Sequence, residues 1–214
     1  MATEVILVRH GQSEGNLVRR FLGHTDLDIT ALGYQQAELV ADALCKEDRP
    51  SAIISSDLMR AYHTAEAIAA KWGMEVIPEK GLREIYAGAW EGISYDELEA
   101  RYPAGYTCFR YNLGRAHPDG GESALEMQKR GQDTLDKIVA TYPDGRVVLV
   151  SHAAFICMLC AGILGLSPDE VPKLGLCENA SITRIVHDKD GYRLLVYGDP
   201  SHLGEHRVKR PPLA

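Results

Sequence analysis

Arg9 and His10 stand directly behind four apolar residues (VILV, 5–8) near the start of the chain. Side chains of similar kinds follow three later apolar runs: Arg60 after 52–56, Glu84 after 75–78, and His152 after 146–150. Guanidinium groups match phosphate oxygens, and a neutral imidazole can attack phosphorus when its other nitrogen is held as a donor. A carboxyl group can protonate a departing alkoxide and then activate water. These residue types predict phosphoryl transfer, which depends mainly on positioning and charge neutralisation.

The elements that must position these side chains alternate along the chain. Apolar runs at 4–8, 52–56, 75–78 and 146–150 predict strands, and helical patterns are expected at about 31–45, 58–72, 94–102, 123–142 and 153–166. The early strands are apolar throughout, which favours a parallel sheet covered on both faces. Runs at 181–188 and 192–198 flank Asp190-Gly191 and predict a hairpin. The fold class expected is α/β, a three-layer sandwich: a mostly parallel central sheet with helices on both faces and a C-terminal antiparallel edge strand.

Helix starts are marked by residues that can act as caps. Thr30 and Asp57 precede two of the helical patterns, and Ser94 and Ser123 are each followed three residues later by Glu, which is a capping-box pattern. In open α/β sheets ligands bind beyond the carboxyl ends of the strands, where helix N-termini also favour anions. The polar side chains that follow the strands are therefore expected to converge at one edge of the sheet.

Composition limits the classes of partner. The chain has 214 residues and a formal net charge of −7, which disfavours binding to nucleic acid or to an anionic membrane. Residues 147–166 are long enough to span a bilayer, but Ser151 and His152 lie within them, so we expect a strand, a polar turn and a buried helix. Five cysteines without dense spacing, and no signal-peptide pattern, predict a cytoplasmic protein with reduced thiols.

The stretch LVRHGQSEGN (7–16) resembles the RHG signature of the histidine phosphatase superfamily, also called the phosphoglycerate-mutase-like family. Blocks similar to that family follow in its order at 23–37, 55–69, 82–92, 118–123 and 147–156, with His202-Leu203 near the end. The resemblance covers nearly the whole chain. It implies a single domain over 1–214, with 93–121 as an excursion that covers the substrate.

The resemblance implies a role for each matched position. His10 would be the phosphorylated nucleophile and Glu84 the general acid and base, while Arg9, Arg60 and His152 would hold the phosphoryl group. The implied substrate-binding residues are Ser13, Asn16, Gly23, Thr25 and Ala153. Many relatives have Gly where Ala153 stands, but its backbone N–H remains available. The family needs no metal, so neither a metal site nor a cofactor is expected, and the expected partner is a small phosphorylated substrate bound by a monomer or homodimer.

Some residues have structural alternatives beside the functional ones. Asn16 can cap a helix instead of contacting phosphate. His63 lies one helical turn beyond Arg60 and is expected to be structural or solvent-facing. Cys157 and Cys160 form a C-x-x-C pattern, but they lie in an apolar helix and are expected to be core residues.

Two further sets stay open or are set aside. Arg101, Arg110 and Arg115 form either a solvated face or a contact with a second anionic group of the substrate. His202 and His206 have the spacing of metal ligands, but no third ligand is suitably placed.

Three functions are compatible with these residues: a phosphomonoester hydrolase, a cofactor-dependent phosphoglycerate mutase, and a non-catalytic phospho-ligand binding module. The binding module is disfavoured because all five chemical residues are present. The block at 82–92 (LREIYAGAWEG) resembles the broad-specificity phosphatase branch more than the mutases, which have a longer basic insertion. A phosphatase acting on small phosphorylated metabolites through phosphohistidine is therefore the preferred function.

Overall fold

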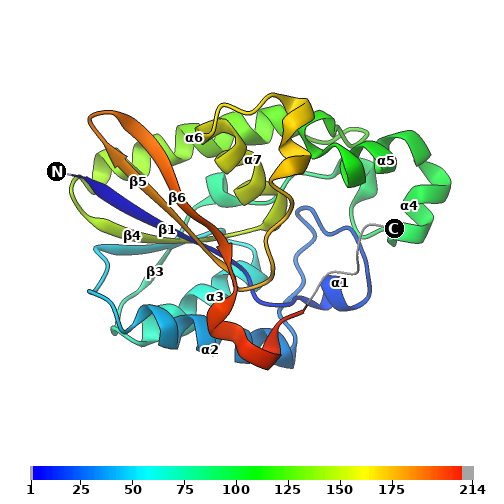
Figure 1. Cartoon of the computed structure of the whole chain (residues 1–214). Helices are drawn as coiled ribbons and strands as arrows, with labels where there is room; N and C mark the ends of the chain where they lie inside the picture. Colours follow the sequence, from blue (N-terminus) through cyan, green and yellow to red (C-terminus); the bar gives the residue numbers. More distant parts are fainter. Residues whose placement is uncertain (1, 209–214) are drawn as a thin grey trace.

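The structure, a computed structural model, describes residues 2–208 and contains one six-stranded sheet in the order β3-β2-β4-β1-β5-β6 (Figure 1). The strands are β1 Thr3–Arg9, β2 Ala52–Ser55, β3 Val76–Pro78, β4 Arg146–Ser151, β5 Ile182–Asp188 and β6 Gly191–Asp199. Strands β1, β2, β3 and β4 pair in parallel, while β5 runs antiparallel to both β1 and β6. The predicted mostly parallel sheet is confirmed, with an antiparallel edge of two strands formed by the predicted hairpin.

Helices connect and cover the strands. The α-helices are α1 Glu14–Leu17, α2 Ala31–Leu44, α3 Met59–Ala70, α4 Tyr95–Arg101, α5 Pro103–Tyr111, α6 Ala124–Thr141 and α7 Ala153–Ile163. Short 3-10 helices are η1 Lys80–Leu82, η2 Gly88–Trp90, η3 Leu113–Arg115, η4 Pro168–Lys173 and η5 Ser201–His206. Within residues 2–208 no helix is long and apolar enough to cross a membrane, and the apolar run at 147–166 forms β4 and α7 as predicted.

The sheet separates two layers of apolar side chains. Helices α6 and α7 lie on one face, and α2 and α3 lie on the other (Figure 1). Successive residues of β1 point to opposite faces: Val5 and Leu7 pack with α6 and α7, whereas Ile6 and Val8 pack with α2 and α3. Each buried aliphatic side chain of this kind contributes about 1.5–3 kcal/mol relative to exposure. The apolar run before Arg9 therefore anchors β1 from both sides.

The pairing register places the polar residues side by side. Arg9, the last residue of β1, is paired with Ser151, the last residue of β4. The backbone N–H of His10 then donates to the Ser151 carbonyl at 2.9 Å. Because β1 and β4 are parallel neighbours, the next residues along each strand, His10 and His152, emerge at the same edge of the sheet.

The predicted helix caps are mostly confirmed. Thr30 and Ser94 accept the expected N–H bonds, and Ser123 and Glu126 form a complete capping box. The prediction for Asp57 is wrong, because α3 begins after Leu58 without a side-chain cap. The Asp57 carboxylate instead forms a two-point pair with Arg83, with both N–O distances 2.6 Å.

The segment 103–121, which is rich in Gly, Pro and Arg, belongs to the predicted excursion at 93–121. It contains α5 and η3, and Pro103 stands in the first turn of α5, where its missing N–H costs nothing. Tyr106 is buried on the inner side of α5, and Phe109 packs against the adjoining core. Helices α4 and α5 lie beyond the end of the sheet rather than over its face (Figure 1).

Candidate active site

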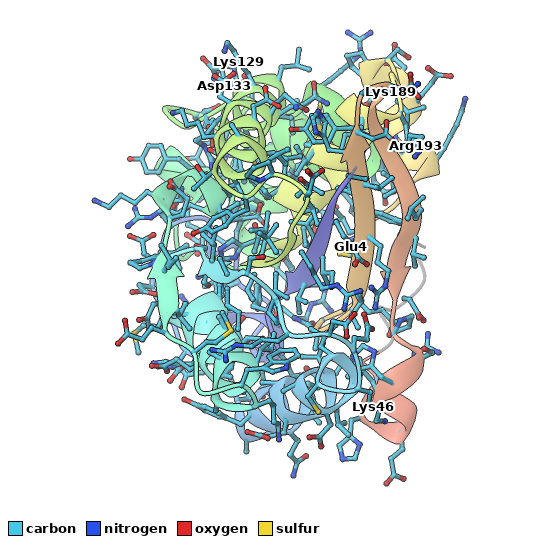
Figure 2. The ribbon with its side chains drawn as sticks, turned by 90° about the vertical axis from the view of Figure 1, so that its left-hand side faces the viewer. Glu4, Lys46, Lys129, Asp133, Lys189 and Arg193 are labelled. Atoms are coloured by element: carbon cyan, nitrogen blue, oxygen red, sulfur yellow. The ribbon has the colours of Figure 1, made fainter. Side chains whose placement is uncertain are left out.

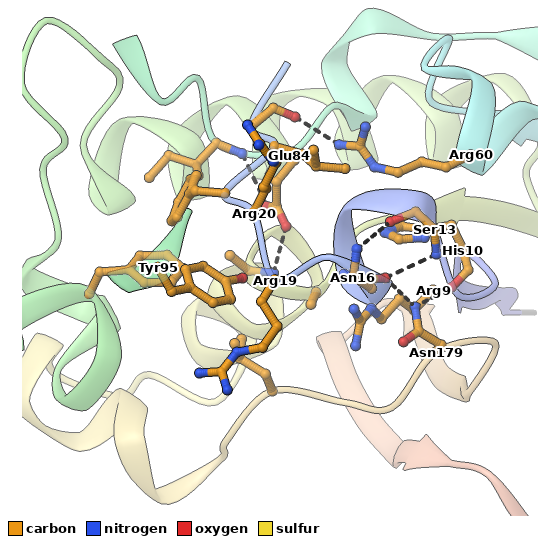
Figure 3. Close-up of a pocket in the computed structure, with 18 of the residues that line it drawn as sticks. Arg9, His10, Ser13, Asn16, Arg19, Arg20, Arg60, Glu84, Tyr95 and Asn179 are labelled. Carbon is orange, nitrogen blue, oxygen red and sulfur yellow. Dashed lines mark hydrogen bonds between the residues drawn. The ribbon is translucent and has the colours of Figure 1, made fainter. Parts of the chain in front are cut away.

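A pocket with a volume of about 300 Å³ lies beyond the carboxyl ends of β1 and β4 (Figure 3). Among the residues predicted from the sequence, those that line it are Arg9, His10, Ser13, Asn16, Gly23, Arg60, Glu84 and Ala153. His152 stands immediately behind His10, with the two ring centroids 5.2 Å apart. Thr25 does not line this pocket and acts through its backbone, as described below.

His10 is buried and held in one orientation. Its Nδ1 lies 2.6 Å from the carbonyl oxygen of Gly11, which can only accept, so Nδ1 carries the proton and Nε2 keeps its lone pair. Burial, reinforced by the charges of Arg9 and Arg60, holds the pKa of His10 well below its ordinary value. The imidazole is therefore neutral at physiological pH. Gly11 makes this geometry possible, since a Cβ there would lie 3.0 Å from the Cα of Gly33.

Two buried arginines flank His10. Arg9 Nη1 donates to the Cys177 carbonyl at 2.8 Å, and Arg60 donates from Nη1 to the Thr25 carbonyl at 2.9 Å and from Nη2 to the Gly23 carbonyl at 2.7 Å. Burial lowers the pKa of Arg60 to about 10, so the side chain stays charged at neutral pH. Among residues 2–208 no carboxylate forms an ion pair with Arg60. A buried cation held by carbonyl oxygens alone favours an anionic ligand.

His152 is fully buried and its two ring nitrogens differ. Nε2 lies 2.8 Å from Ser56 Oγ, whereas Nδ1 is buried and has no hydrogen-bond partner in the described part of the chain. Burial, with the nearby charge of Arg60, holds the pKa of His152 well below its ordinary value. The orphan Nδ1 is a polar atom that a bound ligand can satisfy.

The Glu84 carboxylate sits at the N-terminus of α7. It accepts backbone N–H bonds from Ala154 at 3.1 Å, from Phe155 at 3.0 Å and from Ile85 at 3.0 Å. A carboxylate suits this position because it satisfies the first N–H groups of the helix and opposes the helix dipole. Among the described residues that line the pocket, Glu84 is the single carboxylic acid.

Arg130 on α6 holds the backbone that carries Glu84. Its Nη1 donates to the carbonyls of Gly81 at 2.7 Å and Arg83 at 3.0 Å, and its Nη2 donates to that of Glu84 at 3.3 Å. The same guanidinium makes two contacts with the Glu122 carboxylate, at 2.9 and 2.8 Å. One side chain thus holds three backbone carbonyls of the segment 81–84. No local sequence pattern marks Arg130, so it was not among the predicted residues.

Asn16 and Ser13 form a capping box at the start of α1, and Asn16 also lines the pocket, so its helix-capping contact does not remove it from the site. Asn16 Oδ1 accepts from Ser13 N at 3.2 Å and from Asn179 Nδ2 at 3.1 Å. These bonds use only the oxygen of the amide, so its Nδ2 is the atom that remains to donate into the pocket. Asn179, which was not among the predicted residues, also donates to the carbonyls of His10 and Gly11 at 3.1 and 3.2 Å.

Gly23 and Thr25 supply the carbonyls that hold Arg60. Gly23 has a φ of +50°, and a Cβ there would lie 2.7 Å from the Cβ of Ala87, so both backbone and space require glycine. Thr25 donates from Oγ1 to Glu91 at 2.7 Å and from its backbone N–H at 2.6 Å. The Thr25 side chain therefore binds Glu91 rather than facing the pocket.

The outer half of the pocket combines arginines with aromatic rings. Arginine and aromatic residues that line the pocket but were not predicted from the sequence are Arg19, Arg20, Phe21, Tyr95, Tyr106 and Phe109. Figure 3 shows Arg19 and Tyr95 on the opposite side of the pocket from Arg9 and Asn179. Of the three arginines left open by the sequence, Arg110 lines the pocket, while Arg101 pairs with Glu97 and Arg115 with Asp169 outside it. The spacing of positions 106, 109 and 110 on one helix face was the available signal.

The remaining candidates are structural. His63 Nδ1 lies 2.7 Å from Asp28 Oδ1 and does not line the pocket. Cys157 and Cys160 are buried in the core as expected, and burial raises the pKa of Cys160 well above its ordinary value. His202 Nε2 lies 3.0 Å from the Ala180 carbonyl. Within the described part of the chain no group of three or more His, Cys, Asp or Glu residues is placed to hold a metal ion.

Comparison with known proteins gives a consistent match. The model of the histidine phosphatase superfamily (branch 1) matches residues 5–200. Phosphoglycerate mutase-like protein 4 of Arabidopsis thaliana is 36% identical over 204 residues, which cover 94% of this chain and 87% of the relative. Glucosyl-3-phosphoglycerate phosphatase of Mycobacterium tuberculosis is 34% identical over 192 residues, which cover 86% of this chain and 85% of the relative. The native structure of a mycobacterial glucosyl-3-phosphoglycerate phosphatase has a TM-score of 0.84 at 33% identity, covering 93% of this chain and all (100%) of that one.

Proposed function

Since the chain belongs to the histidine phosphatase superfamily, we propose that it hydrolyses phosphomonoesters of small metabolites with His10 as the nucleophile. The observation that carries this proposal is the bond from His10 Nδ1 to the Gly11 carbonyl, at 2.6 Å. That bond fixes the tautomer in which Nε2 has a free lone pair. Because burial keeps the ring neutral, the lone pair is available without prior loss of a proton.

The first step transfers the phosphoryl group to His10. Nε2 forms a bond to phosphorus as the bond from phosphorus to the ester oxygen breaks, and the leaving oxygen takes a proton from the Glu84 carboxyl group. In the second step water attacks phosphorus, gives a proton back to Glu84 and releases inorganic phosphate, which restores His10. Glu84 fits both roles since it is the single acid among the described pocket residues and is fixed at the start of α7.

Arg9, Arg60 and His152 neutralise and orient the transferred group. The two guanidiniums are already positioned by backbone carbonyls, so little reorganisation is needed when charge develops on the phosphoryl oxygens. The unpartnered Nδ1 of His152 is a candidate donor to one of those oxygens when it carries the proton and Ser56 donates to Nε2. Asn16 Nδ2 and the backbone N–H of Ala153 are the further donors we propose, because both residues line the pocket.

The direct test is hydrolysis of p-nitrophenyl phosphate in buffer that contains EDTA. Wild-type protein is expected to be active, and His10→Ala is expected to lose essentially all activity because no phosphohistidine can form. The exposed histidine variant His117→Ala serves as the control and should retain full activity. Unchanged turnover by His10→Ala, or a strict need for added metal, would contradict the mechanism.

A phosphoglycerate mutase reaction is the alternative to hydrolysis, because relatives named as phosphoglycerate mutase-like or probable phosphoglycerate mutase also match this chain. A mutase would return the phosphoryl group from His10 to a second hydroxyl instead of to water. Phosphorus NMR with 3-phosphoglycerate separates the two: free phosphate supports the hydrolase, and 2-phosphoglycerate supports the mutase. The single-domain organisation, the cytoplasmic location and a monomeric or homodimeric state stay predictions from the sequence.

A further inference from the structure

The pocket carries more positive charge than a phosphoryl group requires. Its lining contains Arg9 and Arg60 beside His10, and three more arginines, Arg19, Arg20 and Arg110, in the outer half. Glu84 is the one acidic residue in this lining. Among residues 2–208 none of the three outer arginines forms an ion pair, although the chain has a net charge of −7 and many of its other arginines do. An anion bound in the outer half would supply the counter-charge that these three arginines lack among the described residues.

Arg110 is the best-oriented of these arginines. Its Nη1 donates to the hydroxyl of Tyr106 at 3.1 Å, and its guanidinium lies 5.5 Å from the ring centroid of Tyr111. Its Nε is buried and donates to no atom of the described residues. A buried N–H without an acceptor is uncommon, so the Nε of this pocket-lining residue is a donor that a ligand oxygen can satisfy.

Arg20 faces the same space from another segment of the chain. Its Nη1 donates to the Gly92 carbonyl at 2.8 Å, and its backbone forms an isolated bridge with Ser94. These bonds tie the segment after α1 to the start of α4. The remaining N–H groups of its guanidinium stay available at the pocket mouth, since the side chain is largely exposed.

Aromatic rings line the space between the two ends of the pocket. Tyr95 and Tyr106 stack with centroids 6.1 Å apart, and Phe21 meets Phe109 edge-on at 4.7 Å. Because these rings pack against one another, the wall is formed before any ligand arrives. An apolar or ring-shaped body of a substrate fits against it better than a strongly hydrated chain.

We propose that the outer half of this pocket selects phosphomonoesters that have an apolar or ring-shaped body and a second anionic group, a carboxylate or another phosphate, bound by Arg20 and Arg110. This rests on the proposed phosphatase function, because the first phosphate must occupy the His10 end. Arg110 provides the oriented contact through its free Nε, and Arg20 provides the charge at the mouth.

The test uses substrates that differ only in charge. 4-(Carboxymethyl)phenyl phosphate and 4-(carbamoylmethyl)phenyl phosphate have closely similar size and leaving group, but only the first has the second negative charge. We expect kcat/KM to be about tenfold higher for the carboxylate, as for one charge-assisted hydrogen bond, and the ratio to fall as salt is added. 4-(Phosphonomethyl)phenyl phosphate tells whether a phosphate-like dianion is preferred to a carboxylate.

Arginine variants test which side chains cause the preference for the carboxylate substrate. Arg110→Gln and Arg20→Gln should each reduce the carboxylate-to-amide ratio toward one, whereas Arg101→Gln, an arginine that is paired with Glu97 outside the pocket, should leave the ratio unchanged. A wild-type ratio near one, or a ratio that survives both pocket variants, overturns the outer anion site. Failure of the wild-type protein to hydrolyse any of the three substrates would contradict the phosphatase function instead, so the two failures are distinguishable.

Discussion

The rings of His10 and His152 lie with their centroids 5.2 Å apart and are both almost completely excluded from solvent. They directly follow the adjacent parallel strands β1 and β4, whose register sets them next to each other. Arg9 and Arg60 are buried close by, so protonation of either ring would add a positive charge to an already cationic interior. Protonation of either imidazole therefore costs folding free energy.

Because His10 and His152 are buried as neutral rings, we expect the free energy of unfolding to fall at acidic pH. The folded-state pKa of each ring is below its unfolded value of about 6.5, so their contribution is complete above pH 6.5 and is lost as pH falls toward the folded pKa. Each histidine should reduce the free energy of unfolding by up to about 1.4 kcal/mol per pH unit in that window. Urea unfolding between pH 7.5 and 5.5 should show a smaller slope for His152→Gln than for wild type. The exposed variant His117→Gln should keep the wild-type slope, and equal slopes in all three proteins would exclude this cause.

Glu84→Gln should slow the hydrolysis of phosphomonoesters by an amount that depends on their leaving group. Without a proton donor, hydrolysis of an alkyl phosphate is expected to fall by roughly 10²–10⁴-fold. p-Nitrophenyl phosphate should lose much less in the first step, because nitrophenolate leaves without protonation. Burst and steady-state rates measured for both substrates check this, with the exposed Glu99→Gln as the control. An equal loss for both substrates in the phosphoryl-transfer step would contradict the acid role.

Arg130→Met tests whether the α6 arginine positions the acid. Its removal takes this donor from the carbonyls of Gly81 and Arg83 and leaves the half-buried Glu122 carboxylate without its cation. The Glu84 carbonyl loses the Arg130 bond but keeps its bond with His24 Nε2 at 2.9 Å. We expect about 1–3 kcal/mol lower stability and a larger loss for alkyl phosphates than for p-nitrophenyl phosphate.

The matched control for this position is Lys129→Gln, which breaks an exposed pair with Asp133 on the same helix and should change neither quantity by much. Loss of stability with the same proportional loss for both kinds of substrate would mean that Arg130 is only structural. Thermal melts and the leaving-group ratio give the two measurements.

The sequence predicted the inner half of the site far better than the outer half. Arg9 and His10 follow an apolar strand directly, so their place at the sheet edge follows from the βα pattern alone. Asp57 shows the limit of local patterns. Its position suits a helix cap, but its carboxylate pairs with Arg83 from another loop. Arg130, Asn179 and Glu91 act on segments distant in sequence, and their contacts depend on tertiary packing that no local spacing encodes.

Among charged surface residues, pairs at i,i+4 on a helix can be predicted from the sequence, whereas pairs between distant segments cannot. Figure 2 shows Lys129, Asp133 and Arg193 on the outside of the molecule, where pairs such as Lys129 with Asp133 follow from i,i+4 spacing. Arg101 also pairs at i,i+4, with Glu97. Tertiary structure decides the other two arginines. Arg110 on α5 lines the pocket, whereas Arg115 on η3 pairs with Asp169 and not with Asp119 at i+4.

Gly23→Ala should reduce both the free energy of unfolding and the affinity for phosphate. Comparison with Gly73→Ala separates the effect of backbone strain from the effect of steric overlap. Both glycines have positive φ, +50° and +57°, so alanine is strained at either position by about 1 kcal/mol. Gly73 has open space where a Cβ would be added, whereas at Gly23 that Cβ would lie 2.7 Å from Ala87. Relief of that overlap must move the Gly23 carbonyl, which accepts from Arg60.

The expected outcome is therefore a difference between two variants with the same backbone strain. Gly73→Ala should lose about 1 kcal/mol in urea unfolding and keep the wild-type inhibition constant for inorganic phosphate. Gly23→Ala should lose at least about 2 kcal/mol and bind phosphate roughly tenfold more weakly, because one of the two carbonyls that orient Arg60 is displaced. If the two variants bind phosphate equally well, the Gly23 carbonyl does not position Arg60 for the anion, and the link from this loop to the phosphoryl site must be abandoned.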